Sequence, residues 1–190
     1  CSKSMNHPHD TPEKTRFNRM RSELTRSIGA MGPESEFHII FFNDFAISMP
    51  SSVPVQAAER PKMRFLYWVQ GLQPAGNTEP LAAILQALSL QPDVLFFLTD
   101  GSFTHRVEQD LLNIQKSGTE IHTYAFEEPF TDEMRRAYHQ LLDDDRTGAR
   151  RTVGSRNDFR KLVEIFESHQ FMKTMAKRHG GRFRLIPYDG

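Results

Sequence analysis

The stretch Asp93-Val-Leu-Phe-Phe-Leu-Thr-Asp100-Gly101-Ser102 decides how the rest of the chain is interpreted. Turn-forming residues bound its apolar run from Val94 to Leu98, which predicts a strand buried on both faces, as in parallel sheets that helices cover. Open α/β folds place ligands at the carboxyl ends of such strands, so Asp100 becomes a candidate site residue. On this stretch alone, the favoured interpretation is that Asp100 and Gly101 form a turn that closes the strand.

The composition points to one globular domain that spans residues 1–190. Of the 190 residues 38% are hydrophobic, and 24 basic residues balance 24 acidic ones, which argues against a nucleic-acid binder that works by bulk charge. Cys1 is the only cysteine, which excludes an internal disulfide and a Cys-based zinc cluster. The sequence contains no signal-type segment and no apolar run near the roughly 20 residues that span a bilayer. We therefore expect neither a nucleic-acid partner nor membrane insertion by this segment, and the cellular location stays open.

Periodic apolar positions predict helices, and short buried runs between them predict strands. This alternation favours an α/β fold with a doubly wound, mostly parallel sheet that helices flank. Residues 127–157 break the rhythm and are interpreted as an insertion that contains solvated loops at 143–146 and 148–157. The predicted helices cover about 12–31, 61–68, 81–88, 104–117, 134–142 and 158–178, and the predicted strands cover 37–42, 45–49, 93–99, 120–126 and 182–186.

Three loops carry oxygen-bearing side chains just before predicted helices. Ser2 and Ser4 lie near the N-terminus, Thr78 follows Gly-Asn in a turn-rich loop, and Asp100 follows the opening strand. In a doubly wound sheet such loops converge on one edge at the switch point. Hydroxyls and a carboxylate form an all-oxygen set of the kind that a hard cation such as Mg²⁺ prefers. The four side chains are therefore the predicted metal ligands.

This order of residues resembles the von Willebrand factor type A (VWA) family, whose metal-ion-dependent adhesion site reads Asp-x-Ser-x-Ser, a distant Thr and a further Asp. Ser2 and Ser4 match the two serines, Thr78 the threonine and Asp100 the last aspartate, and Met5 after the second serine also fits. The resemblance covers nearly the whole chain apart from 127–157. It implies a Rossmann-like doubly wound fold, a bacterial source, and bound Mg²⁺, with Mn²⁺ or Ca²⁺ as alternatives.

The family's first aspartate, and the central strand that ends in it, would come before Cys1. In one interpretation the chain is cut just after that first strand, which leaves an open groove between the strands at 37–42 and 93–99. We then expect the 190-residue chain to be unstable or to aggregate through its exposed strand edges. In the other interpretation Cys1 is the lipid-bearing first residue of a bacterial lipoprotein, with Ser2 behind it.

The resemblance implies a non-enzymatic module for adhesion or complex assembly. Hydroxyl ligands leave a cation under-neutralised, so an Asp or Glu of a protein partner would complete its shell. Two alternatives stay open: a metal-independent structural subunit whose site has decayed, and a magnesium-dependent phosphoryl-transfer hydrolase. The sequence contains no phosphate-binding glycine loop, no Gly-x-Ser-x-Gly elbow and no second catalytic acid paired with Asp100, so we expect no enzyme.

Further polar residues have simpler interpretations. His7 and His9 are expected in a solvated loop, and Asn43 with Asp44 in a turn that ends a strand. Glu79 is interpreted as a rim charge or a helix N-terminal charge.

Overall fold

The computed structural model describes Met5 and residues 15–99, 105–115, 118–127, 132–147 and 157–187, with the backbone alone at 105, 144–147 and 157–161. The chain contains both helices and strands, as the sequence predicts, and they alternate singly from α3 to α5. In order, the elements are α1 (Arg16–Ala30), β1 (Glu36–Phe37), β2 (Ile40–Phe42), β3 (Ala46–Ser48), β4 (Val55–Gln56), α2 (Glu59–Gly71), α3 (Leu81–Ser89), β5 (Val94–Thr99), α4 (His105–Leu112), β6 (Glu120–Phe126), α5 (Asp132–Thr147), α6 (Asn157–Arg178) and β7 (Phe183–Ile186).

The parallel sheet has three strands in the order β5-β6-β7. The other described strands form two antiparallel pairs, β1 with β4 and β2 with β3. Among the described residues β5 pairs only with β6, and β2 only with β3. The α/β class with a parallel sheet is therefore confirmed, whereas a larger doubly wound sheet that lacks its first central strand stays a prediction.

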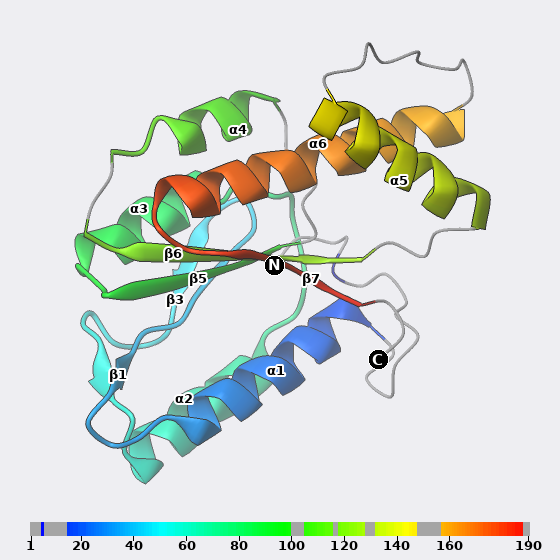
Figure 1. Ribbon diagram of the computed structural model, residues 1–190. Coiled ribbons are helices and arrows are strands. Elements are labelled where there is room, and N and C mark those ends of the chain that lie inside the picture. The colour runs from blue at the N-terminus through cyan, green and yellow to red at the C-terminus, as the bar shows by residue number, and fades with distance from the viewer. Residues whose placement is uncertain are drawn as a thin grey trace.

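Three helices cover one face of the parallel sheet (Figure 1). Alternate residues of β5 and β6 point to this face, because successive side chains of a strand point to opposite sides. They pack against apolar residues of α3, α4 and α6 to form a closed core. Its buried members are Ile84, Leu95, Phe97, Val107, Leu111, Ile114, Ile121, Ala125, Phe171, Met172 and Met175.

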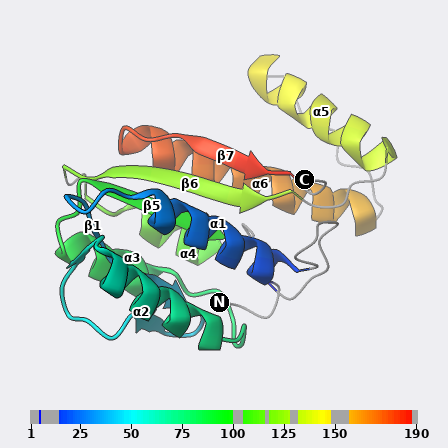
Figure 2. The same ribbon diagram turned by 90° about the horizontal axis from the view of Figure 1, so that it is seen from below.

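A second core lies on the other side of the sheet, where α1 and α2 run side by side (Figure 2). It joins the inner faces of these helices to the short strands β1 and β2. Its buried members are Met5, Phe17, Met20, Ile28, Phe37, Ile39, Phe41, Met49, Ala57, Phe65, Val69 and Phe126. Trp68, predicted to pack rather than to bind, lies against this core with its ring centroid 5.8 Å from that of Phe41.

The prediction that β5 is buried on both faces is wrong for two of its residues. Val94 is 39% exposed and Phe96 is 68% exposed, whereas Leu95 and Phe97 are buried. The reason is the position of α1, which covers this side of β5 only toward its carboxyl end, where Leu98 packs against the second core.

The strand predicted at 37–42 is interrupted at His38 and Ile39, because the chain changes partner there from β4 to β3. The loop predicted at 143–146 belongs to α5, which continues to Thr147. Leu141 is buried against α6, so the packing carries the helix past its predicted end.

The N-terminal helix begins later than predicted. The hydroxyl of Thr15 caps α1 by accepting from the Asn18 amide at 3.2 Å, and the predicted cap at Thr11 lies outside the described residues. None of the helices that the structure describes is both long and apolar enough to cross a bilayer.

Candidate functional site

The loop that carries Thr78 is fixed to the turn after β2. The Glu79 amide donates to the carbonyl of Asn43 at 2.8 Å. Asp44 Oδ1 accepts from the Asn77 amide at 3.2 Å and from Asn77 Nδ2 at 2.7 Å. These bonds reach both residues that flank Thr78, which is itself half-buried. The position of Thr78 is therefore set by a turn more than 30 residues earlier in the chain.

Gly76 makes this close approach possible. Its φ is +75°, in the left-handed region that favours glycine, and a Cβ at this position would collide with the carboxylate of Asp44. The turn itself is closed by the Phe45 amide, which donates to Asn43 Oδ1 at 2.9 Å. The predicted turn at Asn43 and Asp44 is confirmed, but no local pattern in the sequence indicates that Asp44 also holds the Thr78 loop.

Of the predicted ligands, the structure describes Thr78 alone. Ser2, Ser4 and Asp100 lie outside the described residues, as do His7 and His9. The convergence of the four ligands therefore stays a prediction.

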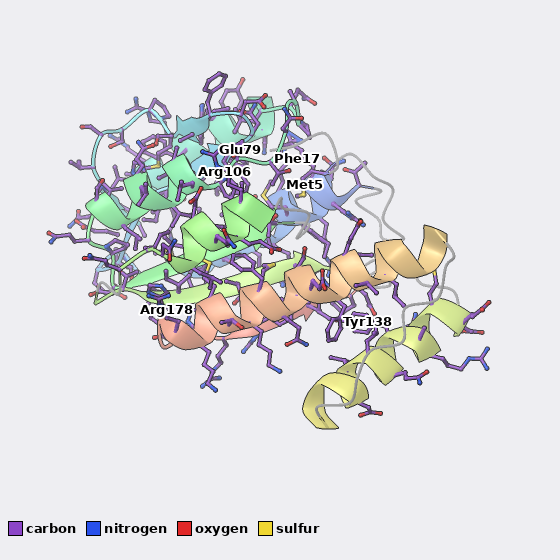
Figure 3. All side chains as sticks on the ribbon, turned by 90° about the horizontal axis from the view of Figure 1, so that it is seen from above. Met5, Phe17, Glu79, Arg106, Tyr138 and Arg178 are labelled. Carbon is purple, nitrogen blue, oxygen red and sulfur yellow. The ribbon has the colours of Figure 1, made fainter. Side chains whose placement is uncertain are left out.

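The described residues beside these ligands do lie near one another. Met5, which follows Ser4, is buried in the second core together with Phe41, and Leu98, two residues before Asp100, packs against the same core. Figure 3 shows Met5 beside Phe17 of α1. Phe41 lies two residues before Asn43, the residue that binds the Thr78 loop.

The described residues around the Thr78 loop carry several oxygen atoms that could bind a metal ion. Asp44 and Glu79 are both exposed, and Thr78, next to Glu79 in the chain, carries a hydroxyl. No group of three His, Cys, Asp or Glu side chains suited to a metal ion occurs among the residues described. A cation at this edge would thus depend on hydroxyl ligands and on the ligands that lie outside these residues.

A second polar cluster, which the sequence did not suggest, lies between α5 and α6 (Figure 3). The hydroxyl of Tyr138 is 2.7 Å from Nδ1 of His169. Burial raises the pKa of Tyr138 to about 12, and the negative charge of Glu127 adds to this rise. Glu127 also pairs with Arg135 of α5 at 3.5 Å. These contacts attach α5 to the rest of the molecule, far from Glu79 in Figure 3.

Comparison with known proteins identifies the fold. No family model matches the chain, and no curated protein has a significantly similar sequence. A solved structure described as von Willebrand factor type A from Catenulispora acidiphila matches with a TM-score of 0.54 and 18% sequence identity. The match covers 92% of this chain and 41% of that chain, so this chain spans less than half of its structural neighbour. The protein therefore has a fold of the von Willebrand factor type A kind.

Proposed function

We propose that this chain is a metal-dependent protein-binding module with an adhesion site of the VWA type. A divalent cation at the carboxyl edge of the sheet would be held by Ser2, Ser4, Thr78 and Asp100, and an Asp or Glu of a partner protein would complete its coordination. The module binds without catalysing a reaction. A bacterial source belongs to the same proposal.

The observation that carries the proposal is the attachment of the Thr78 loop by Asp44. Two hydrogen bonds from Asn77 to Asp44, together with the bond from Glu79 to Asn43, hold the backbone on both sides of Thr78 beside the end of β2. Such preorganisation favours metal or ligand binding, because a site whose coordinating side chains are disordered must order them on binding, which lowers its affinity.

The donor set fits a hard cation. Three hydroxyls and one carboxylate are oxygen ligands, which suit Mg²⁺ or Mn²⁺. With one negative charge among the four, the bound ion keeps a net positive charge that attracts a further carboxylate. The cation supplies this attraction, and the chain supplies the hydroxyls and the carboxylate that orient it.

The test is calorimetric titration of the chain with MgCl₂ and MnCl₂. Thr78→Ala and Asp100→Ala should abolish metal binding, whereas Thr25→Ala, which removes an exposed hydroxyl of α1, should leave it unchanged. Equal metal affinity in the two site variants and the parent chain would refute the metal site.

Partner binding is tested separately with a short fluorescein-labelled peptide that carries one Glu, against the same peptide with Gln. Fluorescence anisotropy should detect binding of the Glu peptide in Mg²⁺ and its loss in EDTA. If both peptides bind equally, or if binding survives EDTA, the proposed mode of partner recognition is wrong.

A further inference from the structure

An aromatic surface lies on the open side of the parallel sheet. The ring of Phe96 stacks on that of His122, with centroids 5.4 Å apart and planes at 15°. The centroid of the Tyr124 ring lies 6.2 Å from that of Phe96. The strand register explains the grouping, because Phe96 is opposite His122 and Leu98 is opposite Tyr124 on neighbouring strands. Phe96 is nevertheless 68% exposed, which is unusual for a large apolar residue of a parallel strand.

The ring of His122 is held on two sides. Nδ1 of His122 accepts a hydrogen bond from the Arg182 amide at 3.1 Å, and Nε2 lies 3.2 Å from a carboxylate oxygen of Glu120. The first bond depends on Gly181, where a Cβ would collide with the carbonyl of Ile121. Because His122 is fixed, the stacked pair is preorganised before any ligand arrives.

Positive charge borders the aromatic surface along β7. Arg184 is opposite Tyr124, and Arg182 lies two residues earlier on the same side of the strand. Both are exposed, and neither side chain forms an ion pair within the described part of the chain. Glu120, the acid on this face, is already engaged by His122. The surface is therefore apolar in the middle and basic on its β7 side.

The surface has room for another element. Figure 2 shows α1 lying along one side of the sheet, and beyond α1 no helix among the described residues covers β6 and β7 on this side. Only Leu98, Phe126 and Ile186, toward the carboxyl ends of the strands, pack against the core under α1. In parallel sheets helices usually cover both faces, so a helix beside α1 is the element that suits this space.

We propose that the surface formed by Phe96, His122, Tyr124, Arg182 and Arg184 docks an amphipathic helix of a partner protein. The apolar stripe of that helix lies on Phe96 and Tyr124, and its Asp or Glu residues face Arg182 and Arg184. The helix is recognised through its apolar stripe, and charge complementarity sets its orientation.

The same residue types would also suit a single-stranded nucleic acid, whose bases stack on aromatic rings. Two observations favour the helix. The ring of Phe96 is already stacked on His122, and the chain carries 24 basic and 24 acidic residues, so no excess of positive charge attracts a phosphate backbone.

The test uses two labelled peptides of 14 residues with the same Leu and Ala stripe. One carries Glu on its polar face and the other carries Lys, and both are titrated with the chain in EDTA, so that the result is independent of any metal site. The Glu peptide should bind and the Lys peptide should not. Phe96→Ala should weaken binding by about tenfold or more, as expected for a central aromatic contact. Tyr67→Ala, which removes an aromatic ring that is 78% exposed on α2, is the matched control and should change nothing.

Charge exchange supplies a second measurement that does not depend on the stability of the Phe96 variant. Arg184→Glu should weaken binding of the Glu peptide and strengthen binding of the Lys peptide. Equal binding of the two peptides by the parent chain, no binding of either, or unchanged affinity in Phe96→Ala would each overturn the proposal. Binding of a labelled uridine oligonucleotide that Phe96→Ala abolishes would assign the surface to nucleic acid instead.

Discussion

Arg21 of α1 and Lys62 of α2 each bind the C-terminal end of the other's helix. The guanidinium of Arg21 donates to the carbonyls of Val69, at 3.4 Å, and Gln70. Lys62 Nζ donates to the carbonyls of Gly29, at 3.0 Å, and Met31. Neither helix has a basic residue in its own last turn. Because α1 and α2 run antiparallel, each supplies a cation that binds carbonyls at the C-terminal end of its neighbour, where the helix dipole is negative.

Removing either cation should destabilise the protein. Arg21→Met and Lys62→Met keep an apolar stem and lose the donors, so each should lower the free energy of unfolding by about 1 to 2 kcal/mol. Urea denaturation followed by circular dichroism measures the change. Arg26→Met is the control, because the Arg26 side chain is 77% exposed and pairs only with Glu23, so its effect should stay within about 0.5 kcal/mol. Equal effects in all three variants would contradict the capping role.

Two glycines should respond in opposite ways to the same substitution. Gly181→Ala places a Cβ against the Ile121 carbonyl, so backbone must move, and we expect a loss of about 1 to 3 kcal/mol. Gly29→Ala adds a methyl group inside α1 where no atom lies within 4 Å apart from its chain neighbours and the nearby backbone of α1, so it should stabilise by up to about 1 kcal/mol. Thermal denaturation of both variants checks the signs. A stable Gly181→Ala protein would mean that the contact between β6 and the start of β7 is looser than described.

The sequence predicted well those helices and strands that are marked by their own hydrophobic period and by turn residues at their ends. The runs around α3 and β6 have clear periods and clear ends, and their predicted bounds match the structure within a residue. The burial of β5 on both faces was predicted wrongly, since Val94 and Phe96 are exposed. A run such as Val94 to Leu98 looks the same whether one face or two are covered, because the covering helices come from distant parts of the chain.

The candidate site shows the same limit. Thr78 was identified from its loop and from the family resemblance, both of which are visible in the sequence. Asp44 was predicted only as a turn residue, because its partner Asn77 lies 33 positions away and no local pattern links the two. The extension of α5 past Leu142 likewise depends on packing against α6, which no periodicity within α5 alone reveals.

Loss of the Asp44 side chain should release the Thr78 loop. Asp44→Ala removes the acceptor of two hydrogen bonds from Asn77, each worth about 0.5 to 1.5 kcal/mol. Hydrogen exchange at the Asn77 amide should accelerate, and Mg²⁺ affinity should fall if Thr78 is a ligand. Asp44→Asn retains an oxygen acceptor and should have a smaller effect on both. Unchanged exchange at Asn77 would show that the loop is held by other contacts.

Stability at high pH should depend on Tyr138. Burial raises the pKa of Tyr138 to about 12, above the value of about 10 expected in the unfolded chain. The protonated hydroxyl therefore favours the folded state below pH 10, and this contribution is lost as the pH rises from 10 through 12. At pH 8, Tyr138→Phe should be less stable than the parent chain, because it loses the contact with His169. At pH 11 the difference in unfolding free energy should be smaller.

Urea denaturation at both pH values measures this difference, and Tyr67→Phe serves as control for general alkaline effects, since Tyr67 is 78% exposed. A difference between Tyr138→Phe and the parent that is constant from pH 8 to 11 would show that the Tyr138 hydroxyl does not titrate differently in the folded and unfolded chains.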